Sequence, residues 1–132
     1  MQPNRMATAL LAIAGVLGTH SVFAQNGGVS RTDLVHHSLS VNGYETQQVR
    51  VNFEAHAFAP AHMHPGEEIA HVLSGTIEYR LDGQAPVTLQ TGQSLFIPAG
   101  VAHSARNVGR GKASELATYV VRTGEPLVTL VH

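Results

Sequence analysis

Residues 62–68 of the chain read HMHPGEE, and this stretch carries the most information about the fold and its chemistry. On a β-strand, side chains two residues apart point the same way, so His62 and His64 should project together while Met63 faces the opposite side. Glu68 follows the Pro-Gly turn and opens the next apolar run. Two imidazoles and a carboxylate are therefore brought close together by local sequence alone.

A third imidazole, His103, follows the turn sequence PAG at residues 98–100. Together with His62, His64 and Glu68 it forms a nitrogen and oxygen ligand set that suits a divalent first-row metal. The chain has nine His and no Cys, which excludes disulfides, Cys-ligated zinc sites and iron–sulfur clusters. The chemistry of this protein must come from imidazole and carboxylate groups.

Around these residues the sequence predicts short β-strands and no sustained helical period. Residues 46–54 alternate apolar Val49, Val51 and Phe53 with polar neighbours, as a half-buried strand does. Further strands are expected at 69–73, 76–81, 87–89, 94–97, 116–121 and 127–131, with a hairpin turn at Asp82-Gly83. Evenly spaced short strands with Gly and Pro between them indicate an all-β sandwich or small barrel.

Two parts of this pattern resemble the sequence motifs of the cupin superfamily. The end of the first motif (His-x-His, three residues, Glu, six residues, Gly) is matched by His62, His64, Glu68 and Gly75. The second motif (Gly, five residues, Pro-x-Gly, two residues, His, three residues, Asn) is matched by Gly92, Pro98, Gly100, His103 and Asn107. The resemblance implies a small β-barrel of the jelly-roll type (double-stranded β-helix), with His62, His64, Glu68 and His103 as ligands of one metal ion.

The chain departs from the first motif at His56, where the motif has Gly. Gly would permit a tight bend there, so the backbone entering the His-x-His strand is expected to differ. His56 is close enough in sequence to approach the mouth of the site, although the intervening loop favours a surface position. The metal ligands themselves are unaffected by this departure.

Side chains alternate between the two faces of a strand, and this alternation predicts which of the remaining residues face inward. Glu67 and the other histidines are expected at the surface or to be incidental, and Asn107 is expected to stabilise a turn or strand edge. Side chains expected to line the interior are small and apolar: Ala70, Val72 and Ala105. The aromatic residues expected in the core are Phe53, Tyr79, Phe96 and Tyr119. No inward general acid or base is identified beyond the ligands, so the catalytic residues stay unassigned.

Residues 1–24 have the pattern of a secretory signal peptide, with Arg5 before the uncharged run ATALLAIAGVLG and small residues before a cleavage site after Ala24. A transmembrane anchor is disfavoured because crossing a bilayer takes about 20 apolar residues. We therefore expect a periplasmic or secreted protein with no membrane segment in its mature form. Residues 25–33 are expected to be a flexible lead-in, and residues 34–132 the cupin domain.

The balance of charge excludes some partners. Lys plus Arg number 8 and Asp plus Glu 9, and charged residues make up 13% of the chain, against about 25% in typical domains. A nucleic-acid binder or a polybasic membrane protein would need a basic face. The expected partner is instead a small-molecule substrate or ligand, and the resemblance to cupins implies a homodimer.

These observations favour an exported mononuclear metal-binding cupin. The leading interpretation is a dioxygenase-type oxidoreductase acting on a small enolic or aromatic compound, with Fe(II) favoured and Mn, Ni or Zn open. Two alternatives stay open: a non-enzymatic metal- or ligand-binding cupin, and a metal-dependent isomerase or lyase. The fold alone does not choose between them, since one fold can host many functions.

Overall fold

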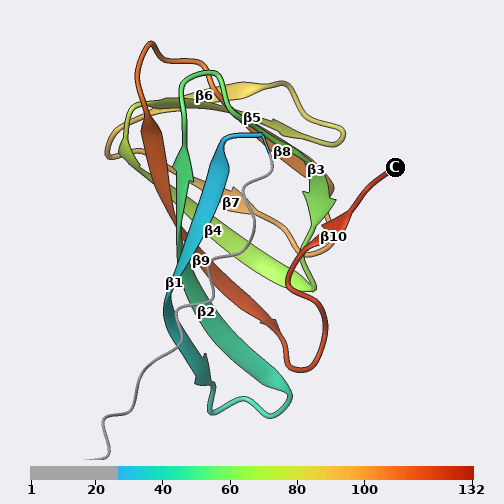
Figure 1. Cartoon of the computed structure of the whole chain (residues 1–132). Helices are drawn as coiled ribbons and strands as arrows, with labels where there is room; N and C mark the ends of the chain where they lie inside the picture. The colour runs from blue at the N-terminus through green and yellow to red at the C-terminus, as the bar shows by residue number, and fades with distance from the viewer. Residues whose placement is uncertain (1–26) are drawn as a thin grey trace, which may run out of the picture.

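A computed structural model describes residues 27–132. In this range the chain forms ten β-strands and no helix (Figure 1). Their bounds are β1 (Val29–Ser38), β2 (Tyr44–Phe53), β3 (Phe58–Met63), β4 (Gly66–Ser74), β5 (Thr76–Leu81), β6 (Val87–Gln90), β7 (Ser94–Ile97), β8 (His103–Asn107), β9 (Ala113–Arg122) and β10 (Thr129–Leu130). Within this part of the chain no helix has the length and apolar character needed to cross a membrane. The predicted signal peptide lies outside the described residues.

The strands form two antiparallel five-stranded sheets that face each other (Figure 1). One sheet has the order β1-β2-β9-β4-β7 and the other β10-β3-β8-β5-β6. Consecutive strands β3 and β4 lie in different sheets, as do β7 and β8, so the chain crosses between the layers as a jelly roll does. The predicted all-β cupin fold is confirmed, and its form is a two-sheet sandwich whose ladders do not close into a complete barrel.

The strand predictions hold best where apolar and polar residues alternate. β5 and β7 have the predicted bounds, and β4 and β9 extend the predicted runs by one to three residues at each end. β2 begins two residues before its predicted run and ends one residue before the end of that run. β10 is shorter than predicted, because only Thr129 and Leu130 pair with β3. β3 carries His62 and β8 carries His103. These two strands pair with each other, and His62 lies opposite His103.

The predicted flexible lead-in at residues 25–33 is wrong from Val29 onward. Residues 29–33 form the first half of β1, which pairs along its length with β2. As the edge strand of its sheet, β1 has few buried apolar side chains and so lacks the sequence signal of a strand. The sheet thus includes residues 29–33, ahead of the predicted domain boundary at residue 34.

The side chains expected in the core are buried between the sheets, with one exception. Ala70, Val72 and Ala105 are buried, as are Phe53, Tyr79 and Tyr119. Phe96, predicted in the core, is instead 57% exposed, and its neighbour Ile97 is buried. The pairing of β7 with β4 explains this: Phe96 is opposite exposed Ile69 on the outer face, and Ile97 is opposite buried Glu68 on the inner face.

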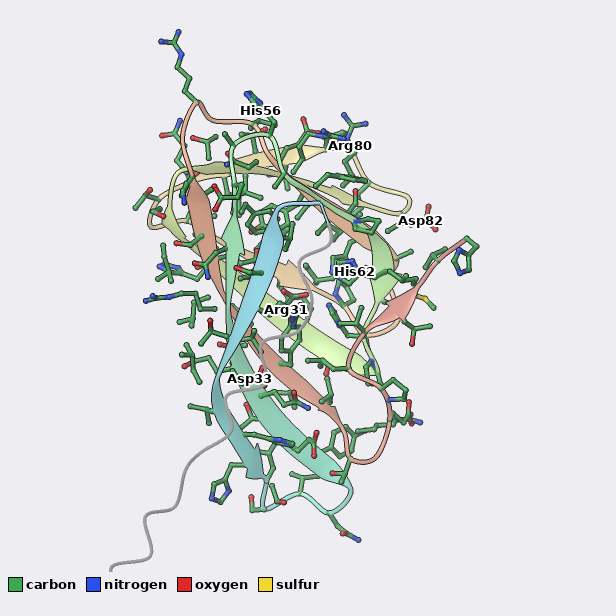
Figure 2. The ribbon with its side chains drawn as sticks, in the orientation of Figure 1. Arg31, Asp33, His56, His62, Arg80 and Asp82 are labelled. Atoms are coloured by element: carbon green, nitrogen blue, oxygen red, sulfur yellow. The ribbon has the colours of Figure 1, made fainter. Side chains whose placement is uncertain are left out.

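The turn between β2 and β3 contains His56, which has a φ of 64°. This is the left-handed region that Gly adopts freely, so the bend expected of the motif's Gly is made here by a His. The side chain of His56 is exposed and lies at the end of the sandwich far from His62 (Figure 2). His56 therefore does not approach the site.

Asn107 stabilises this turn, as predicted. Its buried side-chain amide donates to the carbonyl oxygens of Glu54 at 3.0 Å and Gly111 at 2.7 Å. Its side-chain oxygen accepts from the backbone N–H of Gly109 at 3.0 Å. One side chain thus ties the β2–β3 turn to the loop that leads from β8 to β9.

Replacing His56 with Gly is expected to stabilise the fold. The left-handed backbone costs a residue with a side chain about 1–2 kcal/mol, and the greater freedom of Gly in the unfolded chain offsets about 0.5–1 kcal/mol of the gain. We expect the free energy of unfolding to rise by about 0.5–1 kcal/mol, measured as a higher urea midpoint with an unchanged m-value. His56→Ala keeps the strain and is the control, so equal midpoints for the two variants would contradict the interpretation.

Candidate metal centre

The four predicted ligands meet between the two sheets. His62 lies near the end of β3, His64 directly follows β3, and His103 begins β8, all from one sheet. Glu68 comes from β4 of the opposite sheet. His64, Glu68 and His103 are each less than 5% exposed, while His62 is half-buried and points between the sheets (Figure 2).

The three imidazoles form a compact group. A ring nitrogen of each of His62, His64 and His103 lies within 4.8 Å of those of the other two, as a shared metal ligand set requires. The Glu68 Oε2 atom lies 2.9 Å from His64 Nε2 and 3.3 Å from His103 Nε2. The carboxylate therefore adjoins two of the three rings, and the structure brings all four predicted residues into one cluster.

Each imidazole is oriented by a backbone carbonyl. Because a carbonyl oxygen only accepts, the Nδ1 atom of each ring must be the N–H donor in these contacts. The acceptors are Pro60 for His62 at 2.7 Å, Leu127 for His64 at 2.6 Å and Val101 for His103 at 2.9 Å. A donor at Nδ1 leaves the Nε2 lone pair available, which is the arrangement found around metal-ligating histidines.

Two buried atoms of the cluster have no hydrogen-bond partner among residues 27–132: His64 Nε2 and Glu68 Oε2. They are within ion-pair distance of each other, yet their geometry makes no hydrogen bond. With Nδ1 carrying the proton, the two atoms are both acceptors, and a buried acceptor left unpaired costs about 1–3 kcal/mol. A cation bound by both would remove this cost, so the residues present fit a divalent metal ion.

The ionisation of the cluster also suits metal binding. Burial lowers the pKa of His62 to about 4, and the neighbouring His103 and His64 add to the effect. Burial alone would raise the pKa of Glu68, but hydrogen bonds and positive charge from the His103 and His64 rings, when these carry a proton on Nε2, outweigh burial and lower that pKa to about 2. Glu68 in turn raises the pKa of His103 against the effect of burial, so a metal ion would take the place of the proton shared between these groups. At neutral pH His62 is thus neutral and Glu68 ionised, as metal ligands must be.

Comparison with known proteins places the chain in a family. A family model described as a cupin domain matches residues 49–121, which is more than half of the chain. The chain belongs to the cupin family. The matched range contains the whole histidine and glutamate cluster.

Individual relatives match parts of this cupin. A 60-residue segment is 37% identical to the dimethylsulfoniopropionate lyase DddQ of Ruegeria pomeroyi and covers 46% of this chain and 30% of that protein. An 84-residue segment is 31% identical to germin-like protein subfamily 3 member 1 of Arabidopsis thaliana and covers 60% of this chain and 40% of that protein. The matched segments therefore span less than half of either curated relative.

Among solved structures, a cupin-like protein from Thermotoga maritima has the same fold. It aligns with a TM-score of 0.70 and 22% sequence identity, over 89% of this chain and 88% of that one. At this level of identity the likeness establishes the fold and leaves the activity open.

The interior of the cupin also holds a buried acid that sequence reasoning missed. Glu115 on β9 is 5% exposed, and its carboxylate accepts a hydrogen bond from the Tyr79 hydroxyl of the opposite sheet. The strand's alternation contains the signal, because Glu115 has the same parity as Tyr119, which was correctly expected in the core. Glu115 is therefore an inward-facing acid beyond the proposed ligands, in a position that the sequence had left unassigned.

Outside the cluster, the other histidines of the described residues lie outside the core, as expected. His36 pairs with Glu45 at 3.1 Å, and His71 contacts the Ser94 hydroxyl at 2.8 Å, outside the core. His132 is exposed, and Glu67 is half-buried, whereas Glu68 is 3% exposed and faces inward. The structure thus separates Glu68 from its neighbour, as the motif spacing requires.

The ligand set predicts a clear pattern of metal loss. Glu68→Ala and His103→Ala should each lower bound metal at least about tenfold, since loss of a direct ligand should exceed the 10–100-fold typical of supporting residues. Metal content after dialysis, measured by elemental analysis on protein shown to be folded by circular dichroism, checks this. Glu67→Ala is the matched control and should retain the metal. Unchanged stoichiometry in the first two variants would refute the ligand set.

Glu115 predicts a dependence of stability on pH. Burial raises its pKa from 4.5 to about 7, and the charge of Glu68 adds to the effect. Between these values the unfolded chain has released a proton that the folded chain keeps, so stability falls as pH rises and levels off above about pH 7. The Gln side chain in Glu115→Gln cannot titrate. Over this pH range the free energy of unfolding, measured in urea, should therefore fall by about 2–4 kcal/mol less in the variant than in the wild type. Parallel pH profiles for the two proteins would contradict this.

Proposed function

We propose that this cupin is an exported enzyme that uses one divalent metal ion held by His62, His64, Glu68 and His103. The observation that supports the proposal is the buried, unpartnered pair of acceptor atoms at His64 and Glu68, 2.9 Å apart. Hydrogen bonds from Nδ1 to the backbone hold the three imidazoles with their Nε2 atoms available. Such orientation by backbone groups is the usual support of a metal centre.

For the reaction, we propose a dioxygenase type acting on a small enolic or aromatic compound, with Fe(II) as the working metal and Mn, Ni or Zn as the other candidates. When bound, the metal would supply a Lewis acid and a meeting point for substrate and O₂. The chain's own residues Ala70, Val72 and Ala105 are small, apolar and buried, and they lie on the inward faces of the strands that carry Glu68 and His103. They favour an apolar substrate body and exclude water.

A metal-dependent lyase or isomerase is the second candidate. The observation that favours it is the buried Glu115–Tyr79 pair, because proton transfer requires groups whose pKa lies near the working pH. The local similarity to a lyase, DddQ, agrees with it. The third possibility is a metal-binding cupin without catalytic activity, which binds a small ligand at the same centre.

Export and dimer formation belong to the same proposal. The N-terminal segment supports export to the periplasm or the medium by its sequence pattern. The outer face of the β7-β4-β9 sheet carries exposed Phe96, Ile69 and Val120 on adjacent strands. Such an exposed apolar group is compatible with a second copy of the chain covering it.

Oxygen dependence separates the candidate functions. Protein loaded anaerobically with Fe(II) is mixed with a panel of enolic and catecholic compounds, and O₂ uptake and product are followed. The dioxygenase proposal predicts substrate-dependent O₂ uptake that Glu68→Ala abolishes. Turnover at the same rate without O₂ would favour the lyase or isomerase. Tight binding of Zn with no turnover, even after exchange to Fe(II), would overturn the enzymatic proposal.

A further inference from the structure

Arg31 on β1 faces the interior of the sandwich, although it comes from the segment expected to be a flexible lead-in. It pairs across the strands with Val51, whose side chain is 3% exposed, so both point to the inner face. Figure 2 shows Arg31 and His62 projecting into the same space between the sheets. The edge strand thus directs a positive charge toward the metal centre.

A single residue links Arg31 to the ligands. The Arg31 Nη2 atom donates to the Tyr119 hydroxyl at 3.1 Å, and its guanidinium carbon lies 5.8 Å from the centre of that ring. The same ring packs edge-on against the ligand His64, with 4.7 Å between ring centroids. Tyr119 is 1% exposed, so it holds the guanidinium beside the cluster in a buried position.

Arg31 has no carboxylate partner within 4.0 Å among residues 27–132, in contrast to Arg80, Lys112 and Arg122 on the surface. Within the same range its one side-chain hydrogen bond goes to Tyr119, whose own hydroxyl proton has no acceptor there. A guanidinium has five N–H donors in a fork that matches a carboxylate. Several donors are therefore available at a half-buried cation.

The balance of charge favours an anion at this position. A divalent ion and Arg31 bring three positive charges, and Glu68 supplies one negative charge. Glu115 neutralises at most one more positive charge, and only when its carboxyl group is ionised. The interior would thus carry a net positive charge with metal bound, and an anionic ligand would neutralise part of it.

We propose that Arg31 and the Tyr119 hydroxyl bind the carboxylate group of a small organic anion, whose other oxygen donor occupies the metal centre. This inference rests on the proposed function, which it deepens by naming the substrate class: a small carboxylate with a neighbouring oxygen group. Tyr119 acts as a positioning residue for the guanidinium and also donates its proton to the ligand. Arg31 makes the direct contact, by a bidentate charge-assisted pair.

The competing interpretation is that Arg31 only offsets the buried charges of Glu68 and Glu115. A purely compensating cation would influence stability or metal content without distinguishing a carboxylate from a neutral amide. The discriminating measurement is therefore ligand selectivity, and the probes are glycolate and glycolamide. Both offer the same hydroxyl to the metal, and only glycolate carries a charge.

The experiment uses the full folded protein loaded with Co(II), whose visible absorption reports ligand binding independently of turnover. We expect wild-type protein to prefer glycolate. Arg31→Met should lose at least about tenfold in affinity for glycolate, the scale of a charge-assisted pair, and keep its affinity for glycolamide. Arg31→Lys should fall between the two, because it keeps the charge without the fork. Arg50→Met, on the exposed outer face of β2, is the matched control and should behave as wild type.

Metal content is measured in parallel. It separates failure of the proposed role of Arg31 from failure of the proposed metal site. Retained cobalt with an unchanged preference for glycolate in Arg31→Met would overturn the role of Arg31 alone. Absence of bound cobalt in the wild-type protein would overturn the proposed function and this inference with it. If Arg31→Met fails to fold, Arg31→Gln replaces it with the same expected loss of selectivity, and full selectivity in that variant would overturn the inference.

Discussion

The 2.9 Å approach of His64 Nε2 to Glu68 Oε2 is the constraint on which the site depends. The two atoms come from opposite sheets, both are acceptors when the His64 ring is neutral, and neither has a hydrogen-bond partner in the part of the chain that the structure describes. Closing the sandwich forces them together, so the fold accepts an unfavourable contact that a cation would reverse. Metal binding and folding should therefore be coupled in this cupin.

The same interior combines polar groups from strands far apart in the chain. Arg31 from β1 contacts Tyr119 from β9, and Tyr79 from β5 donates to Glu115 of β9. These contacts place a cation, a hydroxyl and a protonatable acid around the ligand cluster. The interior is thus an apolar core that also holds these polar groups, and the proposed chemistry depends on them.

Local patterns predicted much of this arrangement. Alternation identified β2 and β5 with nearly their observed bounds, and the alternation of β4 placed Glu68, Ala70 and Val72 on one inward face. Prediction failed where the pattern is weak or ambiguous. β1 is an edge strand with mostly exposed side chains, and β7 is so short and apolar that Phe96 was expected inside although Ile97 is the buried residue.

The sequence by itself determined the all-β class and pointed to the four residues of the proposed ligand set, because both depend on spacings of a few residues along a strand. Only the tertiary structure decided what surrounds them. His64 is oriented by the carbonyl of Leu127, 63 residues away, and Arg31 reaches Tyr119 across 88 residues. Such contacts follow from the pairing register of strands that meet only in the folded sheets. No short stretch of sequence encodes that register, so the orientation of the ligands and the position of the interior cation became visible only in three dimensions.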